Sequence, residues 1–103
     1  METLETYESF KKVLNEPFVM IVAKSHRCAT CQVIVPHLEK NLIHLDQFKT
    51  YQIYVDDVEQ FRGEHVIFSV PTVLIFNEGK EILRESRFID ISKINRLLEA
   101  YFN

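Results

Sequence analysis

The chain has 103 residues, of which 47% are apolar and 26% charged, and its formal net charge at pH 7 is −3. These values predict a single globular domain over residues 1–103, with a core large enough to fold without a metal or a structural disulfide. Acidic and basic residues are mixed along the chain without a run of Lys or Arg. This mixing argues against a binding surface for nucleic acid or for a charged membrane.

The amino terminus reads METLETYESFKK and lacks the basic segment followed by an apolar segment that marks a secretory signal. The longest apolar run near it, residues 18–23, is too short to cross a bilayer. We therefore expect a cytoplasmic protein that does not associate with membranes. In that compartment a close cysteine pair is more often catalytic or metal-binding than a permanent structural disulfide.

The first half of the chain predicts a helix, a strand and a second helix. Residues 3–15 carry apolar side chains at helical spacing, and Pro17 ends that helix. Residues 18–23, with the sequence FVMIVA, form a continuous apolar run typical of a strand buried on both faces. Helical spacing then resumes over residues 29–45.

The next segment predicts two strands with a short helix between them. The strands are residues 51–55, YQIYV, and residues 72–76, TVLIF. The short helix covers residues 58–61 and precedes Gly63.

The carboxyl-terminal segment predicts a hairpin and a helix. Residues 77–79 form a turn in which the glycine takes a positive φ, and residues 81–85 pair antiparallel with the preceding strand. A final amphipathic helix follows, with Asp90 or Ser92 as its N-cap. Alternating strands and helices imply parallel pairing, and the hairpin adds an antiparallel edge. We therefore predict an α/β fold with a mixed central sheet of about four strands and helices on both faces.

Most aromatic side chains fall on the apolar faces of these elements. Those expected in the core are Tyr7, Phe10, Phe18, Phe48, Phe61, Phe68 and Phe76. The histidines without a partner pattern, which we expect at the surface, are His37, His44 and His65.

The only two cysteines, Cys28 and Cys31, follow a buried strand and begin a helix. Orphan N–H groups and the helix dipole favour a thiolate at such a terminus, and Arg27 adds positive charge beside it. This placement predicts that Cys28 is the outer, nucleophilic sulfur and that Cys31, one turn further in, resolves the mixed disulfide. Two buried thiols without a role remain an alternative.

A metal site is a further alternative, because a structural zinc ion needs four protein ligands. His26 and His37 lie near the cysteines in sequence, and a CxxC pair shared across a dimer interface can complete such a set. The chain has no second CxxC motif, so we expect no metal. His26 is expected to be an exposed polar residue rather than a base.

Four features of the chain resemble the thioredoxin family. The CATC motif follows a buried strand, and Pro36 lies eight residues after Cys28, where thioredoxins carry the proline of the active-site helix. The segment SVPTVLIFNEG is similar to the thioredoxin segment in which a cis-proline, here Pro71, precedes a strand and a glycine turn. YVDD matches the family's strand-end aspartate at Asp56. The resemblance covers nearly the whole chain and implies a thioredoxin-like fold.

The resemblance also implies a substrate-binding surface formed by Val70, Pro71 and Arg27. In this family the residue before the cis-proline, here Val70, pairs its backbone with an incoming peptide. Pro71 packs against the cysteines and, lacking an N–H group, leaves the thiols accessible. Arg27 occupies the position of the family's tryptophan.

Several other positions depart from the family pattern. Ala29-Thr30 replaces Gly-Pro inside the motif, and Val22 replaces a buried aspartate thought to take the proton of the resolving thiol. Gln52 replaces that aspartate's lysine partner. Arg87 replaces a glycine near the substrate groove, where a side chain can narrow the groove or favour acidic partners.

Together these features predict a thiol-disulfide oxidoreductase without a cofactor. The Cys28–Cys31 pair would exchange reversibly with disulfides of client proteins and contribute to cell redox homeostasis. A thioredoxin reductase or another dithiol donor would supply the electrons to what we expect to be a monomer. The alternative is a non-enzymatic thioredoxin-fold binding module or redox sensor whose CxxC pair changes its affinity for a partner.

Overall fold

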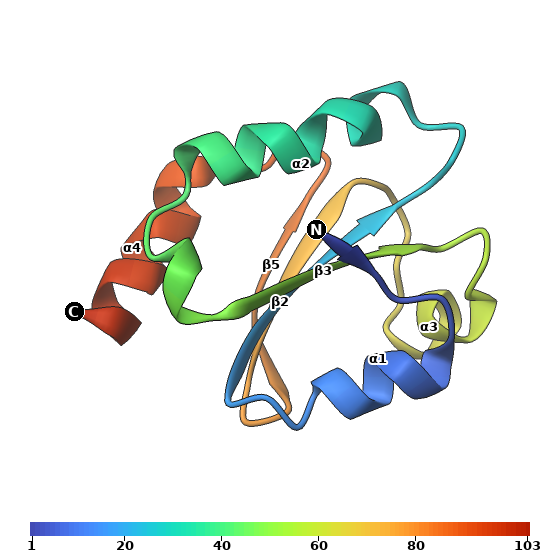
Figure 1. Ribbon diagram of the computed structural model, residues 1–103. Helices are drawn as coiled ribbons and strands as arrows, with labels where there is room; N and C mark the ends of the chain where they lie inside the picture. Colours follow the sequence, from blue (N-terminus) through green and yellow to red (C-terminus); the bar gives the residue numbers. More distant parts are fainter.

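The computed structural model describes residues 1–103 and is built around one five-stranded sheet (Figure 1). The spatial order of the strands is β1-β3-β2-β4-β5. The β1–β3 and β3–β2 pairs are parallel, whereas β2–β4 and β4–β5 are antiparallel. The strands are β1 (Glu2–Thr3), β2 (Phe18–Lys24), β3 (Lys49–Tyr54), β4 (Thr72–Asn77) and β5 (Lys80–Ser86).

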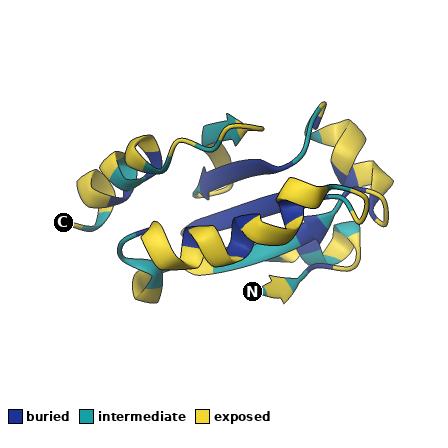
Figure 2. Ribbon diagram, turned by 90° about the horizontal axis from the view of Figure 1, so that it is seen from above, coloured by how far each residue is buried: buried dark blue, intermediate teal, exposed yellow.

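Four α-helices cover the two faces of this sheet, with α2 and α4 on one face and α1 and α3 on the other (Figure 1). They are α1 (Tyr7–Val13), α2 (Ala29–Asn41), α3 (Glu59–Glu64) and α4 (Ile91–Phe102), and a 3-10 turn spans Leu45–Gln47. Figure 2 shows buried strands lying between helices whose outer faces are exposed.

The central strand β2 divides the core in two, because its side chains alternate between the faces of the sheet. Val19 and Ile21 pack in the cluster that includes Phe10 of α1. Met20 and Val22 pack in the cluster on the α2 and α4 face. All seven residues of β2 are buried, so the loop that follows it starts from a fixed position.

The α/β class and the mixed sheet with helices on both faces are confirmed, and the sheet has one strand more than expected. The added strand is β1, a two-residue edge strand that pairs with β3. The predicted helix at residues 3–15 is wrong at its start, because α1 begins at Tyr7. Thr6 caps it: Ser9 N donates to Thr6 Oγ1 at 3.0 Å, and Thr6 N donates to Ser9 Oγ at 3.3 Å.

The ends of other helices and strands differ from the predicted ends by a few residues. The helix α2 ends at Asn41 rather than near residue 45, and His44 then takes a left-handed φ of 59°. The predicted turn between β4 and β5 is confirmed, with φ of 51° at Glu78 and 79° at Gly79. Asp90 is the N-cap of α4, as one of the two expected alternatives, and accepts from Lys93 N at 3.1 Å.

Three expectations about side-chain burial are wrong, and one of them concerns His44, whose side chain is only 25% exposed. Phe68 is 89% exposed, because it lies in the irregular segment between α3 and β4 rather than on the apolar face of a helix or strand. His65 is half-buried among aromatic rings, with its ring centre 4.8 Å from that of Phe10. Burial lowers the pKa of His65, and the negative charge of Glu81 offsets part of this effect.

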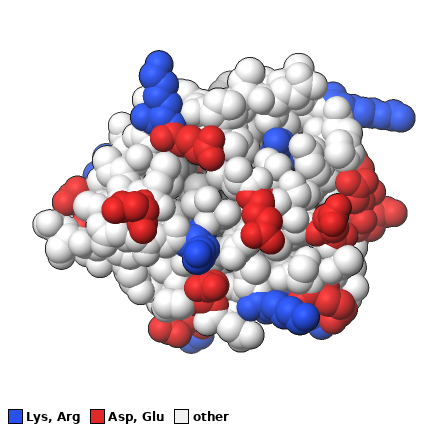
Figure 3. All heavy atoms as spheres, viewed as in Figure 1, with Lys and Arg blue, Asp and Glu red and all other residues white.

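The surface shows no continuous basic patch on the face drawn in Figure 3, where Lys and Arg side chains are separated by neutral or acidic surface. None of the helices is long and apolar enough to span a bilayer.

Candidate thiol-disulfide site

The two cysteines lie where the loop after β2 enters α2. Cys28 is the N-cap of α2, and its Sγ accepts a hydrogen bond from Cys31 N at 3.2 Å. The two residues are joined as a disulfide, with their Cα atoms 5.2 Å apart. Cys31 is fully buried, whereas Cys28 is partly exposed. The outer sulfur is therefore accessible to another molecule and the inner one is shielded.

Val70 and Pro71 lie beside the outer sulfur. The Val70–Pro71 peptide bond is cis, and Cys28 Sγ lies 3.9 Å from the Val70 carbonyl oxygen. Pro71 is buried and immediately precedes β4. The N–H and C=O groups of Val70 make no backbone hydrogen bond within the chain. An unpaired stretch of backbone thus borders the cysteine pair.

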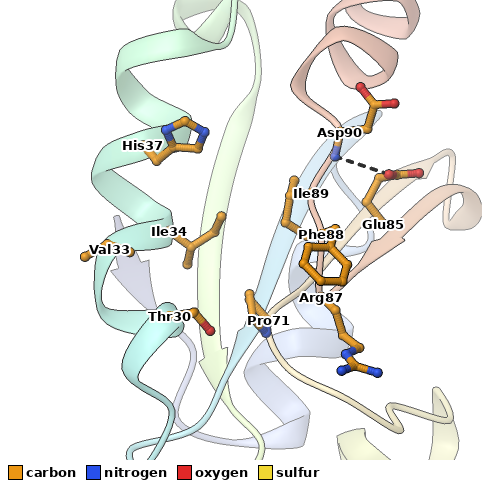
Figure 4. Close-up of a pocket in the computed structure, with 10 residues that line it drawn as sticks. All are labelled: Thr30, Val33, Ile34, His37, Pro71, Glu85, Arg87, Phe88, Ile89 and Asp90. Carbon is orange, nitrogen blue, oxygen red and sulfur yellow. Dashed lines mark hydrogen bonds between the residues drawn. The ribbon is translucent and has the colours of Figure 1, made fainter.

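A groove of about 580 Å³ starts at Pro71 and runs between α2 and the segment that joins β5 to α4 (Figure 4). Thr30 and Pro71 lie at its end near the cysteines, and Ile34 and Ile89 face each other across it. Phe88, on the wall opposite α2, is 87% exposed. The groove therefore offers apolar surface next to the reactive end of the helix.

Arg87 forms part of the groove wall in an uncommon backbone conformation. Its φ is 65°, in the left-handed region that favours glycine. Its N–H group donates to the Pro71 carbonyl at 2.8 Å, which ties the wall to the segment before β4. In Figure 4 its side chain extends away from α2, at the same end of the groove as Pro71.

Two aspartates after β3 fix the loop before Cys28. The Asp56 carboxylate accepts from Ser25 Oγ and from His26 N, both at 2.8 Å. The hydrogen bonds from His26 and Ser25 lower the pKa of Asp56. His26 is exposed, as expected, and its Nε2 lies 2.8 Å from an Asp57 carboxylate oxygen. The carboxylates thus hold the loop that presents Cys28.

Arg27 lies apart from the groove. It lines a separate surface depression with Asp56, Glu59 and Arg62, whereas Pro71 lines the groove and Val70 lies beside Cys28. The structure therefore brings four of the five candidate site residues together, and Arg27 flanks them.

Beneath the start of α2, the sheet carries a polar group that the sequence analysis missed. Val22, fully buried, is paired in register with Gln52. Lys24 Nζ donates to Gln52 Oε1 at 3.0 Å, and Gln52 Nε2 donates to Thr3 Oγ1 at 2.8 Å. Lys24 is buried, and the signal in the sequence is its spacing of two from Val22, which places both side chains on the same face of β2.

No group of three or more His, Cys, Asp or Glu side chains lies close enough together to hold a metal ion.

Comparison with known proteins identifies the family. The thioredoxin family model matches residues 2–100. The thioredoxin-like protein YdfQ of Bacillus subtilis is 32% identical, over 99% of this chain and 89% of that protein. Among solved structures, Plasmodium falciparum thioredoxin superposes with a TM-score of 0.84 at 19% identity, covering 98% of this chain and 99% of that one. Malassezia sympodialis thioredoxin gives 0.82 at 26% identity, covering 97% and 89%. The chain therefore belongs to the thioredoxin family and is a thiol-disulfide oxidoreductase.

Proposed function

We propose that Cys28 is the nucleophile and Cys31 the resolving thiol in exchange with disulfides of cytoplasmic client proteins. The observation that carries this assignment is the position of the pair at the start of α2, with Cys28 partly exposed as the N-cap and Cys31 fully buried. The helix terminus and its free N–H groups favour a thiolate on Cys28.

In the reduced protein, the Cys28 thiolate attacks one sulfur of the client disulfide, and the other client sulfur leaves as a thiolate that takes up a proton. The thiolate of Cys31 then attacks Cys28 Sγ, which forms the Cys28–Cys31 disulfide and releases the second client thiolate. The client gains two electrons and the dithiol loses them. A thioredoxin reductase or another dithiol donor returns the protein to the dithiol form.

The client chain binds beside Cys28 through its backbone. The unpaired N–H and C=O groups of Val70 offer pairing of the β type, and the apolar groove accepts side chains that follow the client cysteine. Pro71 has no N–H group and no charge, so it leaves the sulfur free of a competing partner. Arg27 flanks the cysteines on the other side, where it contacts clients that extend beyond the groove. We propose that the protein acts as a monomer in this exchange.

Two single substitutions test the roles. Cys31→Ser should accumulate a stable mixed disulfide between Cys28 and a client, detected as a mass adduct that dithiothreitol removes. Cys28→Ser should form no such adduct and should have no turnover. Equal activity of the two variants, or adduct formation at Cys31 in the Cys28→Ser protein at the same rate, contradicts the assignment.

The second candidate is a redox sensor that uses the same disulfide exchange to change its affinity for a partner, and it is favoured by the absence of a carboxylate at Val22, on the sheet face beneath the cysteines. Reduction of insulin disulfides with NADPH and a thioredoxin reductase separates the two. Steady multiple turnover supports the reductase and contradicts the sensor, whereas a single stoichiometric turnover supports the sensor.

A further inference from the structure

Lys24 is the one charged side chain among the buried residues, with 7% of its surface exposed. It is the last residue of β2, and its side chain lies on the same face as Met20 and Val22, which pack beneath α2. No carboxylate lies within ion-pair distance of its ammonium group. Its only hydrogen-bond acceptor is the neutral amide oxygen of Gln52, at 3.0 Å.

Lys24 and Cys31 border the same small cavity, whose volume is about 270 Å³. The other lining residues are Ser25, His26, Gln32 and Tyr54. The Lys24 ammonium lies 5.1 Å from the centre of the Tyr54 ring, on which the His26 ring stacks at 3.9 Å.

The cavity has no carboxylate in its lining. Its titratable side chains are Lys24 and Tyr54 from the two strands, His26 from the loop and Cys31 from α2. Asp56 and Asp57 lie outside it, where they bind Ser25 and His26.

A buried cation without a counter-ion is costly, and a neutral amide compensates for only part of that cost. A thiolate on Cys31 would supply the missing negative charge across the cavity. Because Lys24 and Cys31 are both buried, this attraction is stronger than it would be between two groups in water. By the same interaction the ammonium favours the charged form of the sulfur.

We propose that Lys24 is a positioning residue for the resolving step, with its ammonium group stabilising the Cys31 thiolate. This inference rests on the proposed roles of Cys28 and Cys31. The Cys31 thiol releases its proton to solvent through the cavity, and its sulfur attacks Cys28 Sγ in the mixed disulfide. The bond between Cys28 and the client sulfur breaks as the Cys28–Cys31 bond forms, and the client thiolate takes a proton from solvent. Lys24 takes no part in the proton transfer and contributes only its charge.

The test uses the reduced Cys28→Ser protein, in which Cys31 is the only thiol. The ultraviolet absorbance of the thiolate, followed against pH, gives the midpoint of Cys31 deprotonation. We expect Lys24→Gln to raise this midpoint by about one unit or more, the size of effect expected of a nearby opposite charge. Lys24→Arg keeps the charge and should restore a midpoint close to that of the parent. A midpoint that is unchanged in Lys24→Gln overturns the proposal.

A second measurement needs no substitution at Lys24, and it tests the interaction between Lys24 and the Cys31 thiolate even if Lys24→Gln does not fold. In the Cys28→Ser protein with carbon-13-labelled lysine, the Cε resonance of Lys24 should shift at the pH midpoint found for Cys31. A Lys24 resonance that does not respond to Cys31 deprotonation contradicts the proposal. Neither readout involves a client, so a failure of client turnover would count against the proposed function and leave this result intact.

Discussion

At the scale of single residues, Arg87 has a backbone conformation that its side chain disfavours. At its φ of 65° the Cβ atom is crowded by the backbone, at a cost of about 1–2 kcal/mol in the left-handed region. Arg87→Gly should therefore raise the free energy of unfolding, by about 1 kcal/mol or less once the greater freedom of glycine in the unfolded chain is included. Urea denaturation of the oxidised protein measures this change. Arg87→Ala keeps the Cβ atom and serves as the control; an equal gain in that variant contradicts the backbone explanation.

His65 gives the fold a sensitivity to mild acid. Burial lowers its pKa in the folded protein below the ordinary value of 6.5, so the unfolded chain binds a proton more readily. The stability that this difference provides is present above pH 6.5 and is lost as the pH falls from there toward the folded-state pKa. The shift at Asp56 acts below its ordinary value of 3.8, outside this window.

We therefore expect His65→Phe to lose less stability than the unmodified protein between about pH 7.5 and pH 5, a range centred near the ordinary histidine pKa. Phenylalanine suits the site because the ring of His65 packs among those of Phe10, Phe61 and Phe76. Thermal unfolding across this pH range measures the effect. Parallel pH profiles for the two proteins would show that His65 does not cause the sensitivity.

The sequence predicts where the cysteine pair and Pro71 lie better than it predicts the residues around them. Cys28, Cys31 and Pro71 stand in short motifs whose spacing is fixed by the chemistry of the family. Lys24 lies at the end of a strand, where a charged residue is ordinarily solvated, and its burial depends on how α2 crosses the sheet. His65 shows no partner pattern in the sequence because two of its neighbouring rings, Phe10 and Phe76, come from distant elements.

At the scale of elements, the start of α1 depends on a reciprocal cap between Thr6 and Ser9. Thr6→Ala removes the hydroxyl that accepts from Ser9 N and should lower the free energy of unfolding by about 1 kcal/mol. Thr6→Ser retains the hydroxyl and should remain within a few tenths of a kcal/mol of the parent. Chemical denaturation of both variants makes the comparison. A similar loss in Thr6→Ser would point to the methyl group of threonine rather than to the cap.

The burial of Leu4 explains why the apolar spacing predicts a helix start that is too early. Leu4 is buried in the same cluster as Phe10 and so fits the helical spacing of the segment. Its side chain reaches that cluster from the end of β1, outside the helix. Apolar spacing indicates only that side chains share a cluster, not that they share a helix. A strand of two residues is also too short to show the alternating pattern of a strand.

At the scale of the whole molecule, the fold class follows from the alternation of apolar runs and amphipathic segments. Three strands with continuous or alternating apolar residues indicate a sheet that helices cover on both faces. The turn at Gly79 indicates an antiparallel strand at its edge. The sequence did not predict the number of strands or the groove beside Pro71. They depend on β1 pairing with β3 and on the path of the segment between β5 and α4, where no periodic pattern guides prediction.

We propose that Cys28 and Cys31 form a reversible redox couple. Equilibration of the protein in graded mixtures of reduced and oxidised dithiothreitol or glutathione, followed by thiol alkylation and mass spectrometry, measures it directly. We predict a single two-electron transition, with the same midpoint from either direction, between roughly −270 and −120 mV, the range of proteins with this chemistry. A pair that stays reduced or stays oxidised across this range, or that oxidises only between molecules, is not a reversible couple within one chain.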